Sequence, residues 1–188
     1  MVLAFGDSLT AGYGLAAEDS FTRQLEAQLR AAGHDVAVRN AGVSGDTTAG
    51  GRARLAWTIA ERPDLVLLEL GANDGLRGID PAETRRNLAA MLEELKRQQI
   101  PVLLAGMRAP PNLGRDYAQE FDGLFAALAA EYDVSYYPFF LDGVAAQPAL
   151  NQADGIHPNA AGVRIIVERI TPYVLRALEQ SGPRKPDA

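Results

Sequence analysis

The sequence LVLLELGANDGLRGIDPAETRRNLAAMLEELKRQQIPVLLA, residues 65–105, contains two apolar runs on either side of an amphipathic segment. The runs at residues 65–68 and 102–105 are short and continuously apolar, which is typical of strands buried on both faces. Between them, Asp80, Pro81 and Glu83 supply a cap residue, a proline at the first helical position and a reciprocal acid, so a helix is expected to begin there. The stretch therefore predicts two parallel strands joined by a helix.

The same alternation of short apolar runs and helical stripes continues on both sides of this unit. Further strands are predicted at residues 2–5, 36–38 and 134–136. Apolar residues at helical spacing predict helices around residues 21–29, 55–59, 121–128 and 163–174, and Pro172 is expected to kink or split the last of these. Five strand–helix repeats indicate an α/β fold with a five-stranded parallel sheet that is covered by helices on both faces.

Length and composition limit the kind of protein this is. With 188 residues the chain is expected to form a single domain over residues 1–180, followed by a polar tail at 181–188. The absence of cysteine excludes disulfides, thiolate catalysis and thiolate metal sites, and two histidines make a histidine-rich metal centre a poor expectation. The protein must therefore do its chemistry with oxygen and imidazole groups.

Charge and hydropathy indicate whether the protein binds nucleic acid or spans a membrane. A net charge of −6 without any run of basic residues argues against a nucleic-acid partner. No apolar stretch approaches the roughly 20 residues of a membrane span, and Met1–Phe5 is too short for a secretory signal. The compartment stays open between the periplasm or exterior, if a signal has been removed, and the cytoplasm. The sequence gives no indication of the oligomeric state.

Small polar motifs follow the predicted strands at the points where they end. They are GDSLT at residues 6–10, NAGVSGD at 40–46, GAND at 71–74 and DGIHP at 154–158. In a parallel sheet of this kind, ligands bind outside the carboxyl ends of the strands. All four motifs are therefore expected at one edge of the sheet.

These motifs contain complementary chemical groups. Ser8 can act as a nucleophile if a base takes its proton, and the imidazole of His157 is such a base near neutral pH. Asp154, three residues earlier, can orient that imidazole. The backbone N–H groups of Ser8 and Gly45 and the side-chain amide of Asn73 can stabilise the oxyanion of acyl transfer.

Each of these residues also has an ordinary structural interpretation. Ser8 can serve as a helix cap, Gly42 and Gly45 can serve only the turn, and Asn73–Asp74 can form an Asx-turn. His157 can be a plain loop residue, His34 is interpreted as structural or solvated, and Phe139 and Phe140 are expected in the core. The four motifs point to catalysis because all of them are expected at the same edge.

The motifs resemble those of the SGNH, or GDSL-type, serine hydrolases. The matching blocks are Gly6-Asp7-Ser8-Leu9, Gly45 within residues 42–46, Gly71-Ala72-Asn73-Asp74 and Asp154-Gly155-Ile156-His157-Pro158. Further stretches, among them residues 44–48, 73–78 and 138–140, resemble the bacterial thioesterase/arylesterase/lysophospholipase branch. The Gly-x-Ser-x-Gly elbow of the α/β-hydrolases is absent around Ser8 and around Ser44.

This resemblance implies a flavodoxin-like three-layer α/β/α sandwich and hydrolysis of acyl esters and thioesters without a metal or other cofactor. It assigns Ser8 as nucleophile, His157 as base and then acid, and Asp154 as the orienting carboxylate. It also implies an oxyanion hole formed by Ser8, Gly45 and Asn73. The substrate is then a small-molecule acyl ester or thioester.

The walls of the acyl pocket are expected in the loops at residues 75–80 and 108–117. The candidate substrate-binding residues are Leu76, Met107, Arg108, Pro110 and Ile156. Three other functions remain open at this point. They are carbohydrate O-acetyl ester hydrolysis, phosphoester hydrolysis with a metal held by Asp7, Asp46, Asp74 and Asp154, and small-molecule binding without catalysis.

Overall fold

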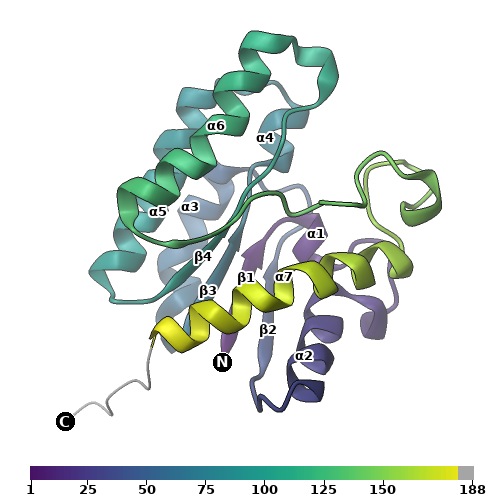
Figure 1. Ribbon diagram of the computed structural model, residues 1–188. Helices are drawn as coiled ribbons and strands as arrows, with labels where there is room; N and C mark the ends of the chain where they lie inside the picture. Colours follow the sequence, from purple (N-terminus) through teal and green to yellow (C-terminus); the bar gives the residue numbers. More distant parts are fainter. Residues whose placement is uncertain (182–188) are drawn as a thin grey trace.

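The computed structural model describes residues 1–181 and shows a single parallel β-sheet between two layers of helices (Figure 1). The strands are β1 (Val2–Gly6), β2 (Val38–Gly42), β3 (Leu65–Glu69), β4 (Val102–Ala105) and β5 (Ser135–Tyr137). They lie in the order β2-β1-β3-β4-β5, and every neighbouring pair is parallel. The predicted five-stranded parallel sheet is confirmed.

The helices connect successive strands and cover both faces of the sheet. They are α1 (Ser8–Ala11), α2 (Phe21–Ala31), α3 (Thr48–Thr58), α4 (Ala72–Leu76), α5 (Pro81–Arg97), α6 (Arg115–Tyr132) and α7 (Ala160–Ser181). Helices α2 and α7 pack together on one face, while α3, α5 and α6 form the layer on the other (Figure 1). The fold is therefore the expected flavodoxin-like α/β/α sandwich.

The core lies on both sides of the three central strands. Every residue of β1, β3 and β4 is buried, and the apolar faces of the covering helices join these strands in one cluster. Burial of apolar surface of this extent is the main favourable term in folding. Among residues 1–181, no helix has the length and apolar character that crossing a bilayer requires.

The strand order determines where a binding crevice forms. The chain passes from β1 outward to β2 and then returns across β1 to β3, so the order reverses between β1 and β3. In open parallel sheets the loops on either side of such a reversal separate and leave a crevice at the carboxyl ends of the strands. Ser8 follows β1 directly and Asn73 follows β3, which places both at this crevice.

The prediction of the second strand was wrong in its position. The structure places β2 at Val38–Gly42, whereas the apolar run lies at residues 36–38. Among the strands of residues 1–181, β2 is at the edge of the sheet and pairs with β1 alone, from Val2–Val38 to Gly6–Gly42. Because one edge and much of its surface face solvent, polar Arg39 and Asn40 are tolerated there.

Two local predictions about helices also differ from the structure. Helix α7 continues through Pro172 without splitting, because apolar neighbours on both sides, such as Ile170 and Val174, are buried in the core. Asp80 does cap α5 by accepting a hydrogen bond from the N–H of Ala82 at 2.8 Å. The reciprocal bond from Glu83 is not formed, because this carboxylate pairs with Arg86 on the helix surface.

Candidate active site

Ser8 lies at the turn between β1 and α1, where it is the first residue of the helix. The cap of this helix is Asp7, whose carboxylate accepts a hydrogen bond from the N–H of Leu9 at 3.0 Å. The alternative interpretation of Ser8 as a cap is therefore wrong. Its side chain is free to face the crevice, and 8% of the residue is exposed.

His157 contacts both Asp154, three residues earlier in its own loop, and Ser8, which lies 149 residues earlier in the chain. Its Nε2 lies 2.9 Å from Ser8 Oγ, and its Nδ1 lies 2.7 Å from Asp154 Oδ2. With a carboxylate at Nδ1, the imidazole carries its proton there, so Nε2 can accept the hydroxyl proton of Ser8. The three predicted triad residues are thus in mutual hydrogen-bond contact.

Asp154 is held as a carboxylate by donors from its own turn. Its Oδ1 accepts hydrogen bonds from the backbone N–H groups of Ile156 at 2.9 Å and His157 at 3.0 Å. Hydrogen bonds from the His157 backbone, the His157 imidazole and the Ile156 backbone lower the pKa of Asp154 to about 2. The group that orients His157 is therefore ionised at any pH above about 3.

Two residues that the sequence analysis missed hold the His157 loop against the Ser8 turn. The ring of Tyr13 lies 4.7 Å from the imidazole of His157, measured between ring centroids. The side-chain amide of Gln152 donates to the carbonyl oxygens of Tyr13 at 2.8 Å and Pro158 at 3.0 Å. Neither residue belongs to a recognisable motif, so only the three-dimensional arrangement reveals this contact.

The backbone around Ser8 and Gly45 provides two hydrogen-bond donors. Within residues 1–181, the N–H groups of Ser8 and Gly45 donate to no protein acceptor. Gly45 has a φ of 82°, a left-handed conformation that favours glycine. Its carbonyl oxygen accepts a hydrogen bond from Arg77 Nη2 at 2.9 Å. The loop conformation thus keeps one N–H unpaired while its carbonyl is bound.

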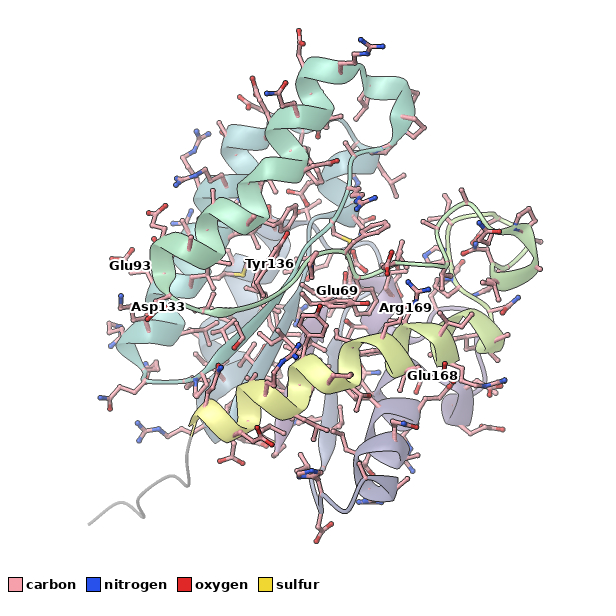
Figure 2. The ribbon with its side chains drawn as sticks, in the orientation of Figure 1. Glu69, Glu93, Asp133, Tyr136, Glu168 and Arg169 are labelled. Carbon is pink, nitrogen blue, oxygen red and sulfur yellow. The ribbon has the colours of Figure 1, made fainter. Side chains whose placement is uncertain are left out.

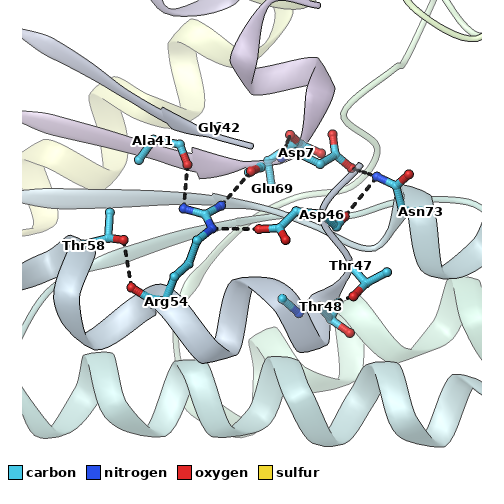
Figure 3. Close-up of polar contacts among 12 residues, drawn as sticks. Asp7, Ala41, Gly42, Asp46, Thr47, Thr48, Arg54, Thr58, Glu69 and Asn73 are labelled. Atoms are coloured by element: carbon cyan, nitrogen blue, oxygen red, sulfur yellow. Dashed lines mark hydrogen bonds and ion pairs between the residues drawn. The ribbon is translucent and has the colours of Figure 1, made fainter. Parts of the chain in front are cut away.

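The side-chain amide of Asn73 uses both of its hydrogens inside the protein. Nδ2 donates to Asp7 Oδ2 at 3.0 Å and to the carbonyl oxygen of Asp46 at 2.9 Å (Figure 3). To reach an oxyanion, Asn73 has to share or redirect one of these hydrogens. A full negative charge is a stronger acceptor than the neutral carbonyl of Asp46, which favours such a change during reaction. The Asx-turn interpretation does not describe these contacts.

A second carboxyl group, Glu69, is buried directly beneath the Ser8 turn. It is 0% exposed and lies in the interior, in contrast to surface residues such as Glu93 (Figure 2). Its Oε2 accepts hydrogen bonds from Thr10 Oγ1 at 2.7 Å and from the N–H of Asp7 at 3.4 Å, while Oε1 has no hydrogen-bond partner in the described part of the chain. Glu69 therefore fixes the backbone on both sides of Ser8.

Burial raises the pKa of two carboxyl groups next to the Ser8 turn, Asp7 and Glu69. Burial raises the pKa of Asp7 to about 6, although hydrogen bonds from Leu9 and Asn73 lower it in part. Burial, reinforced by the nearby charge of Asp7, raises the pKa of Glu69 well above its ordinary value. Glu69 is consequently a neutral acid at pH values where Asp154 is fully ionised.

This buried proton makes stability depend on pH. An unfolded Glu titrates near about 4.3, whereas the pKa of folded Glu69 is raised, so folding retains a proton that the unfolded chain releases. The resulting stabilisation is complete below about pH 4 and is lost as the pH rises toward the folded-state pKa. Glu69→Gln keeps the accepting oxygen without a titrating proton, so urea unfolding should show its stability relative to wild type increasing from pH 5 to pH 8.

The matched control for this experiment is Glu93→Gln, which changes an exposed carboxylate on α5. It should leave the pH dependence of wild-type stability unaltered. Parallel stability curves for the Glu69→Gln variant and the wild type between pH 5 and pH 8 would show that folded Glu69 is ionised.

A cavity of about 460 Å³ opens beside Ser8 and His157. All five predicted pocket residues line it, namely Leu76, Met107, Arg108, Pro110 and Ile156. The sequence analysis missed the wall from residues 139–146, which contributes Phe139, Leu141, Ala145 and Ala146. Phe140 is in the core as expected, whereas Phe139 lies in this wall beneath the guanidinium of Arg108. The apolar residues at 139–146, which follow the last strand in the sequence, could have indicated this wall.

The four aspartates of the metal alternative each have protein partners, and Asp7 accepts a hydrogen bond from Asn73. Asp46 pairs with Arg54, Asp74 accepts hydrogen bonds from Thr48 and Thr84, and Asp154 binds His157. Within residues 1–181 no three histidine or acidic side chains are grouped so that they could hold a metal ion. The donor set therefore does not fit a metal-dependent phosphoesterase. His34 lies in the turn between α2 and β2, away from these groups.

Comparison with protein families gives a match over most of the chain. Residues 4–165 match the model of the GDSL-like lipase/acylhydrolase family. The chain is similar to esterase TesA of Pseudomonas aeruginosa, with 42% identity over 91% of this chain and 86% of that protein. It is 39% identical to an arylesterase of Vibrio mimicus, over 94% of this chain and 89% of that protein.

A third relative and a solved structure extend these similarities. Thioesterase 1/protease 1/lysophospholipase L1 of Escherichia coli is 40% identical over 84% of this chain and 75% of its own length. The crystal structure of AlinE4, an SGNH-hydrolase family esterase, is 51% identical and superposes with a TM-score of 0.79. That superposition covers 94% of this chain and 95% of AlinE4.

Proposed function

The chain belongs to the GDSL-like lipase/acylhydrolase family and is an ester hydrolase, and we propose that it acts through an acyl-enzyme formed on Ser8. The observation that carries this proposal is the continuous contact from Ser8 Oγ through the imidazole of His157 to Asp154. In this assignment residues 1–180 act as one hydrolase domain.

In the first half of the reaction, Ser8 Oγ attacks the carbonyl carbon of the substrate while His157 Nε2 takes the hydroxyl proton. The carbonyl oxygen becomes an oxyanion, and the N–H groups of Ser8 and Gly45 and the amide of Asn73 stabilise it. When the intermediate collapses, the alcohol or thiol leaves with the proton from Nε2. The acyl group remains on Ser8.

In the second half, water attacks the acyl-enzyme and transfers its proton to the same imidazole. His157 then returns this proton to Ser8 Oγ as the carboxylic acid leaves. Asp154 stabilises the imidazolium in both steps and remains an ionised carboxylate throughout. Each turnover consumes water and ester and restores the free hydroxyl, so the residues of the chain suffice for the reaction.

The lining of the cavity favours substrates with an apolar acyl chain. Leu76, Met107 and Ile156 present apolar atoms to it, and Arg108 is the one Asp, Glu, Lys or Arg side chain among the described lining residues. Burial of one methylene group contributes about 0.8 kcal/mol, which corresponds to roughly a fourfold gain in kcat/KM if the transition state is stabilised equally. We therefore propose acyl esters and acyl thioesters as the substrate class, ahead of acetylated sugars.

A series of p-nitrophenyl esters from acetate through butyrate and octanoate to palmitate tests this assignment. The expected result is a rise in kcat/KM by up to about fourfold per methylene until the cavity is filled, then a plateau or decline. Ala145→Phe, which places a ring in the wall of the cavity, should move the optimum to a shorter chain. Acyl-CoA thioesters measured in parallel establish the preference between oxygen and sulfur esters.

The same series can contradict the assignment. A preference for acetate over every longer chain, together with faster hydrolysis of acetylated sugars, would favour a carbohydrate O-acetylesterase. If a fluorophosphonate failed to label Ser8 and no ester were hydrolysed, a binding function would replace the enzymatic one.

A further inference from the structure

Arg54, on helix α3, connects three segments at the carboxyl ends of the strands. Its Nη2 donates to the carbonyl oxygen of Gly6 at 2.9 Å, and its Nη1 donates to that of Ala41 at 2.9 Å. Its Nε donates to Asp46 Oδ2 at 2.7 Å (Figure 3). These four residues, here termed the Arg54 network, join the ends of β1 and β2 to the loop that contains Gly45.

The Arg54 network is largely withdrawn from solvent and is tightly packed. The side chain of Arg54 is 20% exposed, that of Asp46 is 14% exposed, and the guanidinium lies 3.9 Å from the ring centre of Phe5. On the other side, the carboxylate of Asp46 lies against the backbone of Gly50. A Cβ atom at position 50 would come within 2.1 Å of Asp46 Oδ1. Asp46 is therefore held between two residues of the same helix.

The network ends at the proposed oxyanion donors. The carbonyl oxygen of Asp46 accepts a hydrogen bond from Asn73 Nδ2, and its peptide bond links it directly to Gly45. Gly6, which Arg54 also binds, is two residues before Ser8. A displacement of Arg54 would thus change the positions of all three donors. It would do so indirectly, because the guanidinium bonds to Gly6, Ala41 and Asp46 and not to the donors themselves.

Only arginine has the donor arrangement that this position uses. A planar guanidinium directs its N–H groups to several acceptors in fixed directions, whereas an ammonium is a compact charge without this geometry. The three acceptors come from three separate segments, so their relative positions depend on a donor of this shape. Ion pairing with Asp46 alone would not require it.

We propose that Arg54 is a positioning residue for the reaction, which sets the location of the oxyanion donors through Asp46 and Gly6. The inference rests on the proposed acyl-enzyme function. Misplacement of catalytic groups by about 1 Å can cost roughly 100-fold in rate. Loss of the network should therefore reduce transition-state stabilisation more than ground-state binding of the ester.

The test compares Arg54→Lys and Arg54→Ala with wild type on p-nitrophenyl butyrate, with the active enzyme counted by fluorophosphonate titration. We expect kcat per titrated site to fall by about 10- to 100-fold while KM changes by less than about threefold. The inhibition constant of an alkylboronic acid, which forms a tetrahedral adduct on Ser8, should rise by a similar factor to the fall in kcat/KM. Guanidinium ion at millimolar concentration should restore part of the activity of the Arg54→Ala variant.

Two further variants make the result independent of any one substitution. Gly50→Ala displaces Asp46 from the opposite side without altering Arg54, and alanine is the better helix former. It should lower kcat in the same way. Arg52→Lys is the matched control, because Arg52 lies on the same helix, is exposed and bonds Asn87 at 3.3 Å. It should match wild type in kcat per site.

Unchanged kcat per titrated site in the Arg54 variants would overturn the proposal, even if their melting temperatures or titratable fractions fell. That result would assign Arg54 to stability alone. If wild type itself neither hydrolysed esters nor reacted with the fluorophosphonate, the proposed function would fail first. The two failures are therefore distinguishable.

Discussion

The Ser8→Ala variant is expected to fold like the wild type and to lose about a million-fold in kcat on p-nitrophenyl esters. The methyl group cannot attack the substrate, so no acyl-enzyme forms and only the oxyanion donors and binding contribute. Folding should be nearly unaffected, because the cap of α1 is provided by Asp7 and, among residues 1–181, the hydroxyl of Ser8 is hydrogen-bonded to His157 alone. Ester hydrolysis, circular dichroism and mass spectrometry of the fluorophosphonate adduct measure these expectations.

Ser44 offers a matched control for this experiment. It lies in the neighbouring loop at residues 43–46 and is exposed, without a hydrogen bond to His157. Ser44→Ala should keep full activity and full labelling. Retention of most activity by the Ser8→Ala variant would eliminate the acyl-enzyme mechanism.

The second large effect is expected for Asp154→Asn, which should reduce kcat by about 10,000-fold. An amide at this position can donate to His157 Nδ1, which would move the imidazole proton to Nε2. Nε2 could then no longer accept the proton of Ser8. KM should change little, because Asp154 is not among the residues that line the cavity.

The pH dependence of the wild type provides a further measurement for Asp154. Since its folded-state pKa is lowered to about 2, its orienting charge is present above the ordinary value near 3.8 and is lost only as the pH falls through about 2. Activity losses between pH 4 and pH 7 must therefore come from other groups. Asp142→Asn, at an exposed carboxylate paired with Arg169, is the control and should keep wild-type kcat. A kcat of the Asp154→Asn variant within tenfold of wild type would contradict the assigned role.

Much of the fold can be predicted from the sequence because three strands are buried on both faces. β1, β3 and β4 appear as continuous apolar runs, and the cap at Asp80 indicates the beginning of α5. Edge strand β2 was misplaced because its residues obey no such pattern. Its position follows from pairing with β1, which is a contact between distant residues.

The same distinction between local pattern and distant contact decides which residues of the candidate site can be predicted from the sequence. Residues that follow the strands directly, such as Ser8 and Asn73, are placed at one edge by any parallel sheet. Arg54 and Glu69 are different, because a charged residue within a helix or at the end of a strand does not by itself indicate which groups it will contact. Their roles depend on which backbone groups come within hydrogen-bond distance after folding. That information is absent from short motifs.

The distance along the chain between Ser8 and His157, 149 residues, has a consequence for biosynthesis. At about 5–20 residues per second, the ribosome adds His157 roughly 7–30 s after it has added Ser8. The serine strand pairs on both sides only after β2 and β3 exist, and the imidazole arrives later still. A nascent chain, or one that ends before His157, therefore has the Ser8 hydroxyl without its proton acceptor and cannot hydrolyse esters by the proposed mechanism.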